Sequence, residues 1–253
     1  MKTGKNVTGI GTSPIDSKKT IEFAESCTVS SGDESAMKQL REEYAKGVDD
    51  GLGCVPPPAS VKGLAQVAMD AFKGQKASVF IDLLGERLAF ERTGTRLYES
   101  VIAKYDAKGG FDGGPSREEL VAFHDAELRH ARMVHDAIEE LGGDPTVVTP
   151  AADVCGVQAS GLVQVVNDPR TTLQQCLSAL LTAELVDNDG WAMLIELADA
   201  MGHDEMAEAF TEAKREEDHH LASLRQWLSA FVGTEAQVEM PLPSAPPPAS
   251  PMP

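Results

Sequence analysis

The sequence has few basic residues for its length. Lysine and arginine together number 22, against 40 aspartate and glutamate residues, so the formal net charge at pH 7 is -18. Such a chain repels phosphate backbones and anionic lipid surfaces, and we therefore expect neither a nucleic acid nor a membrane as partner. The acidic surplus is compatible with collecting cations, although many proteins have acidic surfaces for solubility alone.

Cysteines are also scarce. Cys27, Cys54, Cys155 and Cys176 form no Cys-x-x-Cys pair, which excludes a zinc ribbon and a rubredoxin-type iron centre. We expect four free thiols. Residues 1–19 lack the apolar segment of a signal peptide, and no run approaches the roughly 18 apolar residues of a membrane span. These absences favour a cytoplasmic location.

Composition divides the chain into three parts. Residues 1–57 are rich in serine, threonine, glycine and charge, which predicts a largely irregular extension with one short helix near 34–46. Residues 58–232 have the hydrophobic periodicity of a helical domain. Residues 233–253 are rich in proline and small side chains, so we expect a disordered tail.

The middle part predicts one short helix and four long ones. The short helix is amphipathic, with Ser60 as its N-cap and Gly74 as its stop. One long helix opens with a capping box, in which Glu119 follows Ser116 by three residues. The long helical segments lie at about 77–106, 116–141, 171–201 and 204–232.

The connections between these segments differ in length. Residues 143–170 show no convincing long helical period and can cross the bundle from end to end, whereas the other two connections are short. This pattern predicts an all-α four-helix bundle with one long crossover connection and an additional N-terminal helix.

Each long helix places a glutamate in the middle of its apolar stripe. In each half of the chain, a glutamate on one helix is followed on the next helix by a Glu-x-x-His motif. Three residues advance a helix by about 4.5 Å and turn it by roughly 60° from the starting direction, so both side chains of the motif can reach one point in the core. The six residues are Glu91, Glu127, His130, Glu184, Glu217 and His220.

Four buried carboxylates need positive charge around them. Without it, their burial would cost several kcal/mol each, which together exceeds the stability of a typical domain. No lysine or arginine is assigned to the four apolar stripes, so we expect cations from solution to balance the charge. Two divalent ions fit, each with one histidine, one terminal carboxylate and a share of two bridging carboxylates. The alternative is a metal-free acidic core, or helices rotated so that some glutamates face water.

With this combined spacing, residues 75–232 resemble the ferritin-like superfamily, in particular bacterial ferritin-like domain proteins and rubrerythrin-type di-iron bundles. The resemblance implies a fold with one long crossover, terminal ligands at Glu91 and Glu184, and bridging ligands at the other two glutamates. It also implies imidazole ligands at both histidines. The matching stretches are Glu91-Arg-Thr-Gly-Thr-Arg-Leu-Tyr98, Glu127-Leu-Arg-His130, Thr-Ala-Glu184-Leu and Glu217-Asp-His-His220-Leu.

Several neighbouring residues complete the expected site. Asp187 shares the inward face of its helix, where it could orient a ligating histidine or act as a seventh ligand. Tyr98 could hydrogen-bond a ligand, relay an electron or simply pack in the core. The Glu216–His219 motif lies one residue out of register and points away from the apolar stripe, so it is excluded as a ligand pair. Gly94 in mid-helix suggests a close helix approach or an open space beside the metals.

The predicted function is an oxidoreductase that uses two iron ions, or two manganese ions, to act on dioxygen, peroxide or ferrous iron. The six metal ligands would then also be the catalytic residues. A second interpretation is a non-enzymatic iron-binding or storage protein that forms a homo-oligomer. A third is a metal-free ferritin-like interaction domain whose N-terminal extension binds a partner protein. The sequence leaves the substrate, the electron donor and the choice of metal open.

Overall fold

The computed structural model describes residues 13, 15–27, 32–49, 51–72 and 76–240. The chain forms two compact units, Met1–Gly51 and Leu52–Pro253. The first unit contains α1 (Ser17–Ser26) and α2 (Ser35–Lys46), neither of which has a buried residue. The helix expected near 34–46 corresponds to α2, while α1 was not predicted. The expected disordered tail falls mostly on residues 241–253, which lie outside the described residues.

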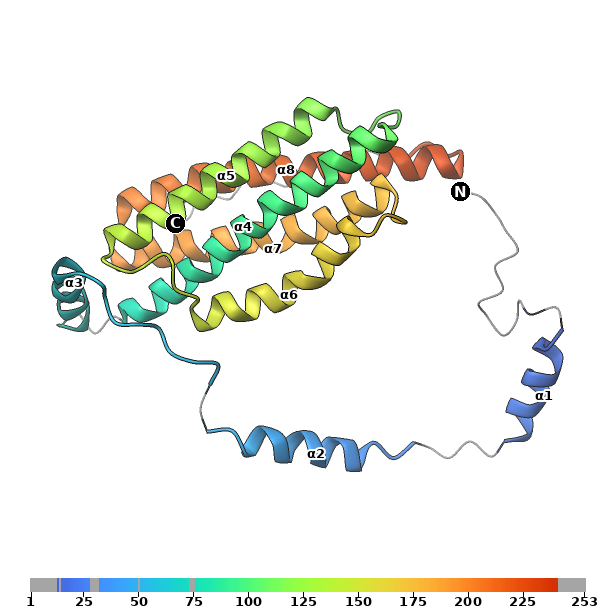
Figure 1. Ribbon diagram of the computed structural model, residues 1–253, viewed down its shortest axis with the longest axis horizontal. Coiled ribbons are helices and arrows are strands. Elements are labelled where there is room, and N and C mark those ends of the chain that lie inside the picture. Colours follow the sequence, from blue (N-terminus) through green and yellow to red (C-terminus); the bar gives the residue numbers. More distant parts are fainter. Residues whose placement is uncertain (1–12, 14, 28–31, 50, 73–75, 241–253) are drawn as a thin grey trace, which may run out of the picture. The chain divides into compact units, whose positions relative to one another are not determined.

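The second unit is a bundle of long helices (Figure 1). A shorter helix, α6 (Pro150–Asn167), lies along α4 and also contacts α7, and α3 (Val61–Phe72) contacts α4. The described residues form helices and no strands, so the all-α prediction is confirmed. None of their helices combines the length and hydropathy that crossing a bilayer requires. The four long helices are α4 (Ala77–Lys108), α5 (Arg117–Glu140), α7 (Leu173–Met201) and α8 (Asp204–Ala236).

Local sequence explains where these helices begin and end. The predicted capping box of α5 is present, with Glu119 N donating to Ser116 Oγ at 3.1 Å and Ser116 N donating to Glu119 Oε2 at 2.8 Å. Helix α7 begins with a second capping box, formed by Thr172 and Gln175. It ends at Gly202, whose φ of 78° places it in the left-handed region that glycine adopts most readily. These caps fix where α5 and α7 begin and where α7 ends.

Residues 143–170 form the long connection that was predicted, but the expectation that they contain no long helix was wrong, because the connection is built around α6. Thr149 caps α6 through Ala152 N, and Pro150 occupies its first turn. Its sequence contains Gly156, Gly161 and five valines, all weak helix formers, and its apolar residues lie on both faces. Packing against α4 and α7 therefore stabilises a helix that its own sequence signals only weakly.

The bundle core consists of two apolar layers with a polar layer between them. One apolar layer contains Leu97, Leu120 and Trp227, and the other contains Phe80 and Phe210. Helices α4 and α8 run from the layer of Phe80 to the layer of Leu97, and α5 and α7 run in the opposite direction. The connection through α6 therefore carries the chain from one end of the bundle to the other. The polar layer is where each long helix contributes its central glutamate.

Candidate metal centre

The structure brings all six predicted residues together in the polar layer. Each side chain is at most 3% exposed. Their carboxylate oxygens and imidazole nitrogens form two clusters, within each of which the atoms lie within 4.8 Å of one another, and Glu217 belongs to both. The first cluster contains Glu127, Glu184, Glu217 and His220, and the second contains Glu91, His130 and Glu217.

Glu217 lies between the two histidines. Its Oε1 is 2.7 Å from His130 Nδ1, and its Oε2 is 3.0 Å from His220 Nδ1. Glu91 Oε2 approaches His130 Nδ1 at 3.7 Å, and Glu184 Oε2 approaches His220 Nδ1 at 3.8 Å. This arrangement suits a carboxylate that bridges two cations, each with its own imidazole.

The tautomer of His130 makes this geometry informative. Its Nε2 donates to Glu216 Oε2 at 2.9 Å, so in the neutral ring Nδ1 carries a lone pair. Nδ1 and Glu217 Oε1 are both buried and lack hydrogen-bond partners among the described residues. Two facing lone pairs at 2.7 Å repel each other unless a cation or a proton lies between them.

Other buried oxygens in this layer have no partner either. Both carboxylate oxygens of Glu91, together with Glu184 Oε2, have no hydrogen-bond partner among the described residues. Buried polar atoms are almost always paired in proteins. Unpaired acceptors directed at common points are the atoms that hard or borderline divalent cations coordinate, so the donor set fits two such ions.

Burial controls the protonation of the metal-free site. It raises the pKa of Glu91, Glu127, Glu184 and Glu217 well above the usual glutamate value, and neighbouring carboxylates add to the effect. Burial also lowers the pKa of both histidines. In the absence of cations, protons therefore balance much of the carboxylate charge.

The expectation that no arginine enters the stripes was wrong. Arg87 is fully buried one turn before Glu91, with its Nε 3.4 Å from Glu91 Oε1 and its Nη1 2.7 Å from Asp187 Oδ1. Its guanidinium stacks on the ring of Phe90 at 4.6 Å. Gly190 provides the space, since a Cβ there would lie 3.0 Å from Arg87 Cζ. From the sequence alone, a charged residue next to an apolar stripe is expected to face solvent. Arg87 is buried because Asp187, on another helix, supplies the opposite charge.

Asp187 therefore does not orient a histidine. Its carboxylate contacts Arg87 Nη1, and its backbone carbonyl accepts from the same nitrogen at 2.9 Å. The acid that holds a histidine is Glu216, which also binds Arg129 Nη2 at 2.9 Å. Glu216 belongs to neither of the two candidate ligand clusters described above.

Tyr98 and Gly94 shape one side of the site. The Tyr98 hydroxyl donates to Oε1 of Glu184, one of the candidate ligands. At Gly94 an added Cβ would collide with Glu127 Oε2, so this glycine allows the carboxylate to lie against α4. The two residues also border a narrow gap between α4 and α7. The mid-helix glycine thus accommodates a candidate ligand.

A family model described as "Ferritin-like domain" matches residues 81–232, which is well over half of the chain. The chain belongs to the ferritin-like domain family. Searches of curated proteins and of solved structures found no match. The family and the buried cluster of carboxylates and imidazoles make this ferritin-like protein compatible with metal binding.

Sequence reasoning missed three polar residues of this ferritin-like site. Arg87 lies four residues before Glu91, and Asn188 lies four residues after Glu184, so a search at helical spacing from each candidate ligand would have found both. Asn188 Nδ2 donates to the backbone carbonyls of Glu184 and Glu217, which ties α7 to α8. Glu216 contacts a histidine on another helix, and no local spacing signals that contact.

Proposed function

We propose that this ferritin-like protein is an oxidoreductase that binds two iron ions, or two manganese ions, and acts on dioxygen, peroxide or ferrous iron. The six proposed ligands are those grouped above, with Glu217 shared by both ions. The observation that carries the proposal is the set of buried, unpaired acceptor atoms that converge between two apolar layers. Such a pair of ions supplies two-electron redox chemistry when bound.

The charge of the site supports this proposal. Four glutamates and Asp187 contribute five negative charges when ionised, and Arg87 contributes one positive charge, which leaves a net charge of -4. Two divalent cations carry the same charge with opposite sign. Arg87 thereby offsets Asp187 and leaves the four glutamate charges for the ions.

The surrounding residues prepare the ligands for binding. Glu216 accepts a hydrogen bond from the Nε2–H group of His130 and so directs the Nδ1 lone pair inward. Tyr98 holds Glu184 by donating to its Oε1, and the apolar layers on either side limit the access of water. Ligands fixed in this way bind metal with little reorganisation.

Metal content is the direct test. Full-length protein from iron- or manganese-supplemented cells, measured by elemental analysis, should contain about two ions per chain. His220→Ala should lose most of this metal, whereas His219→Ala, which alters the exposed histidine beside it, should retain it. A content near zero in the wild type, or equal losses in both variants, would contradict the proposed ligand set.

Aerobic addition of ferrous iron, and separately of peroxide, distinguishes an oxidoreductase from a storage protein. We expect catalytic turnover that depends on His220, followed by absorbance. Retention of a soluble mineral core in a large assembly would instead support iron storage. Metal binding with neither turnover nor mineral would contradict both of these functions.

A further inference from the structure

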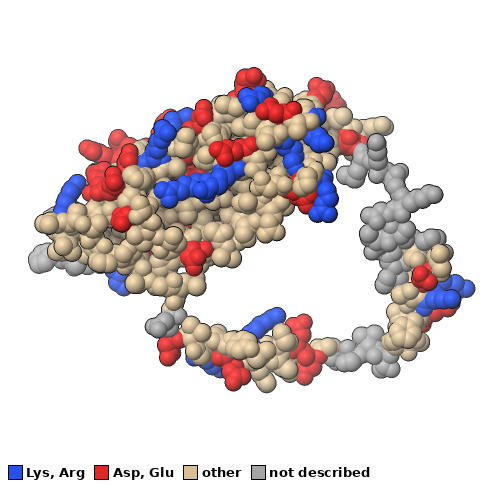
Figure 2. Space-filling view, viewed as in Figure 1, with Lys and Arg blue, Asp and Glu red and all other residues tan. Residues whose placement is uncertain are grey.

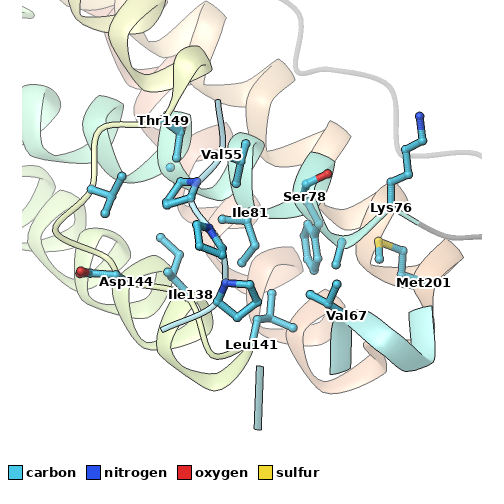
Figure 3. Close-up of a pocket in the computed structure, with 18 of the residues that line it drawn as sticks. Val55, Val67, Lys76, Ser78, Ile81, Ile138, Leu141, Asp144, Thr149 and Met201 are labelled. Carbon is cyan, nitrogen blue, oxygen red and sulfur yellow. The ribbon is translucent and has the colours of Figure 1, made fainter. Parts of the chain in front are cut away.

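An apolar cavity of about 440 Å³ lies at the end of the bundle where α5 and α7 finish and α4 and α8 begin. Figure 3 shows Ile81, Ile138 and Leu141 gathered around this space, while the Lys76 side chain extends away from it. Phe80 and Met201 contribute further apolar wall. The cavity volume falls in the range of roughly 300–1,000 Å³ that is typical of small-molecule sites.

One wall is a proline strap, which we define as Val55–Pro58. Ala59 N donates to Gly142 O at 2.9 Å just after the strap, and Gly63 packs so closely on Gly142 that an added Cβ would lie 2.9 Å from Gly142 Cα. The strap is therefore anchored to the end of α5. Its three prolines have no N–H groups, so they place no unpaired backbone donor in the cavity.

Among the described residues that line the cavity, His203 provides a buried polar atom without a partner. His203 Nε2 is buried and has no hydrogen-bond partner among the described residues, while its ring stacks on Phe80 with centroids 5.5 Å apart. The carboxylate of Asp144 at the rim already accepts from Thr146 N and Oγ1. The Thr149 hydroxyl donates to the Asp82 carbonyl. Lys76 and Asp144, the charged residues of the lining, are both exposed at its rim, so a charged ligand would find no counter-charge inside the cavity.

We propose that this cavity binds an uncharged, mainly apolar small molecule with one polar group, which forms a hydrogen bond with His203 Nε2. Apolar walls hold water poorly, and an empty space of this size forfeits packing contacts that a ligand would restore. Ile81 lies ten residues before Glu91 on α4, or about 15 Å along the helix axis. The ligand thus binds apart from the metal centre, and its binding does not depend on the proposed redox function.

Titration of the full-length protein with the neutral fluorophore N-phenyl-1-naphthylamine tests the site. We expect saturable binding of about one molecule per chain. Ile81→Trp fills the cavity and should weaken binding of the fluorophore by at least about tenfold. This loss corresponds to one buried apolar group of the fluorophore that no longer packs against the cavity wall. Val79→Trp is the matched control, because Val79 is 49% exposed on the same helix and does not line the cavity.

Leu141→Phe provides a second, smaller obstruction at a partly exposed position should Ile81→Trp fail to fold, as judged by circular dichroism. Absence of saturable binding to the wild-type protein would overturn the proposal. Unchanged binding to the folded variants that obstruct the cavity, or equal weakening in Val79→Trp, would also overturn it, since the probe would then bind elsewhere.

The role of His203 has its own test. We expect the wild-type protein to prefer 1-naphthol over 1-methylnaphthalene, measured by displacement of the fluorophore. His203→Phe keeps the aromatic ring and removes the nitrogen, so it should reduce this preference by about 2- to 10-fold, as expected for one hydrogen bond. An unchanged preference would show that His203 does not contact the polar group.

Discussion

At the residue scale, the buried ion pair between Arg87 and Asp187 sets the negative charge that remains on the four glutamates of the candidate metal centre. Both side chains are at most 3% exposed, and Arg87 Nε also lies 3.4 Å from Glu91 Oε1. Removing one partner of such a pair leaves the other charge buried without compensation. Arg87 is thus expected to matter for folding as well as for metal binding.

Arg87→Met should lower the free energy of unfolding by about 3–5 kcal/mol, since it leaves Asp187 unpaired. The double variant Arg87→Met with Asp187→Leu should recover part of this loss, which a double-mutant cycle with urea unfolding measures. Arg92→Met, on the exposed face of α4, is the control and should change stability by less than about 0.5 kcal/mol. Additive effects of the two single changes would show that the pair is not coupled.

Glu216 is the acid that fixes the tautomer of His130. Glu216→Ala should weaken metal binding by about 10- to 100-fold, because His130 then loses the group that orients its ring. Competition with a chelator measures the affinity, and Glu212→Ala serves as an exposed acidic control on α8. Equal metal affinities of the two variants would show that Glu216 does not support metal binding.

At the scale of the helices, glycine has opposite roles in α4 and α6. Gly94 is required by the close approach of Glu127, whereas a Cβ at Gly156 would have open space around it. Glycine inside a helix is less favourable than alanine by up to about 1 kcal/mol where no contact requires it. Only the tertiary contacts distinguish the two positions.

Gly156→Ala should therefore raise the free energy of unfolding by about 0.5–1 kcal/mol and leave metal content unchanged. Gly94→Ala should lower metal content, because its Cβ displaces Glu127 from its position against α4. Thermal unfolding and elemental analysis of both variants test these expectations. Full metal content in Gly94→Ala would mean that Glu127 is not held at this position.

At the scale of the whole molecule, the raised carboxylate pKa values link stability to pH. Groups whose pKa is higher in the folded protein stabilise it below their unfolded pKa, and this stability is lost as pH rises through the folded value. The two histidines have pKa values lowered by burial, so their contribution is lost only as pH falls below the ordinary histidine value of about 6.5 and through the lower folded values. Above that pH the carboxylates decide the trend.

The melting temperature of the metal-free protein should fall between about pH 6.5 and pH 8.5, while that of the metal-loaded protein should stay nearly constant. Metal ions replace the protons that leave the carboxylates, so the stabilisation they provide grows with pH. Calorimetry on both forms over this range measures the difference. A metal-induced rise that shrinks with increasing pH would contradict the raised pKa values.

The homo-oligomer that belongs to the storage interpretation would be expected to form through α6. Copies with a net charge of -18 repel each other, but α6 has one charged residue, Asp153, and exposes Val154 and Val157. Figure 2 shows the surface around α6 as largely tan. Val157→Glu should convert the oligomer to a monomer in size-exclusion chromatography with light scattering, unlike the control Val232→Glu at the end of α8. A monomeric wild-type protein would contradict this prediction.

Helical periodicity was sufficient to predict the four long helices and the layer in which their glutamates lie. Every helix of a bundle buries an apolar stripe, so its apolar residues recur every three or four positions. The glutamates interrupt these stripes at the same height in the bundle. By contrast, α6 has no polar face. Its sequence therefore lacks the alternation of apolar and polar residues that reveals a helical period. The cavity beside the proline strap is lined by residues that lie far apart in the sequence, from Val55 to His203, and no local pattern signals it.

By itself, the sequence determined that Glu91, Glu127, His130, Glu184, Glu217 and His220 share the inward faces of four helices, because spacing along a helix dictates direction around it. Only the tertiary structure decided the partners of these residues: Arg87 joins Asp187, and Glu216 joins His130. Pairing between helices depends on their relative rotation and approach, which follow from side-chain packing across the whole core.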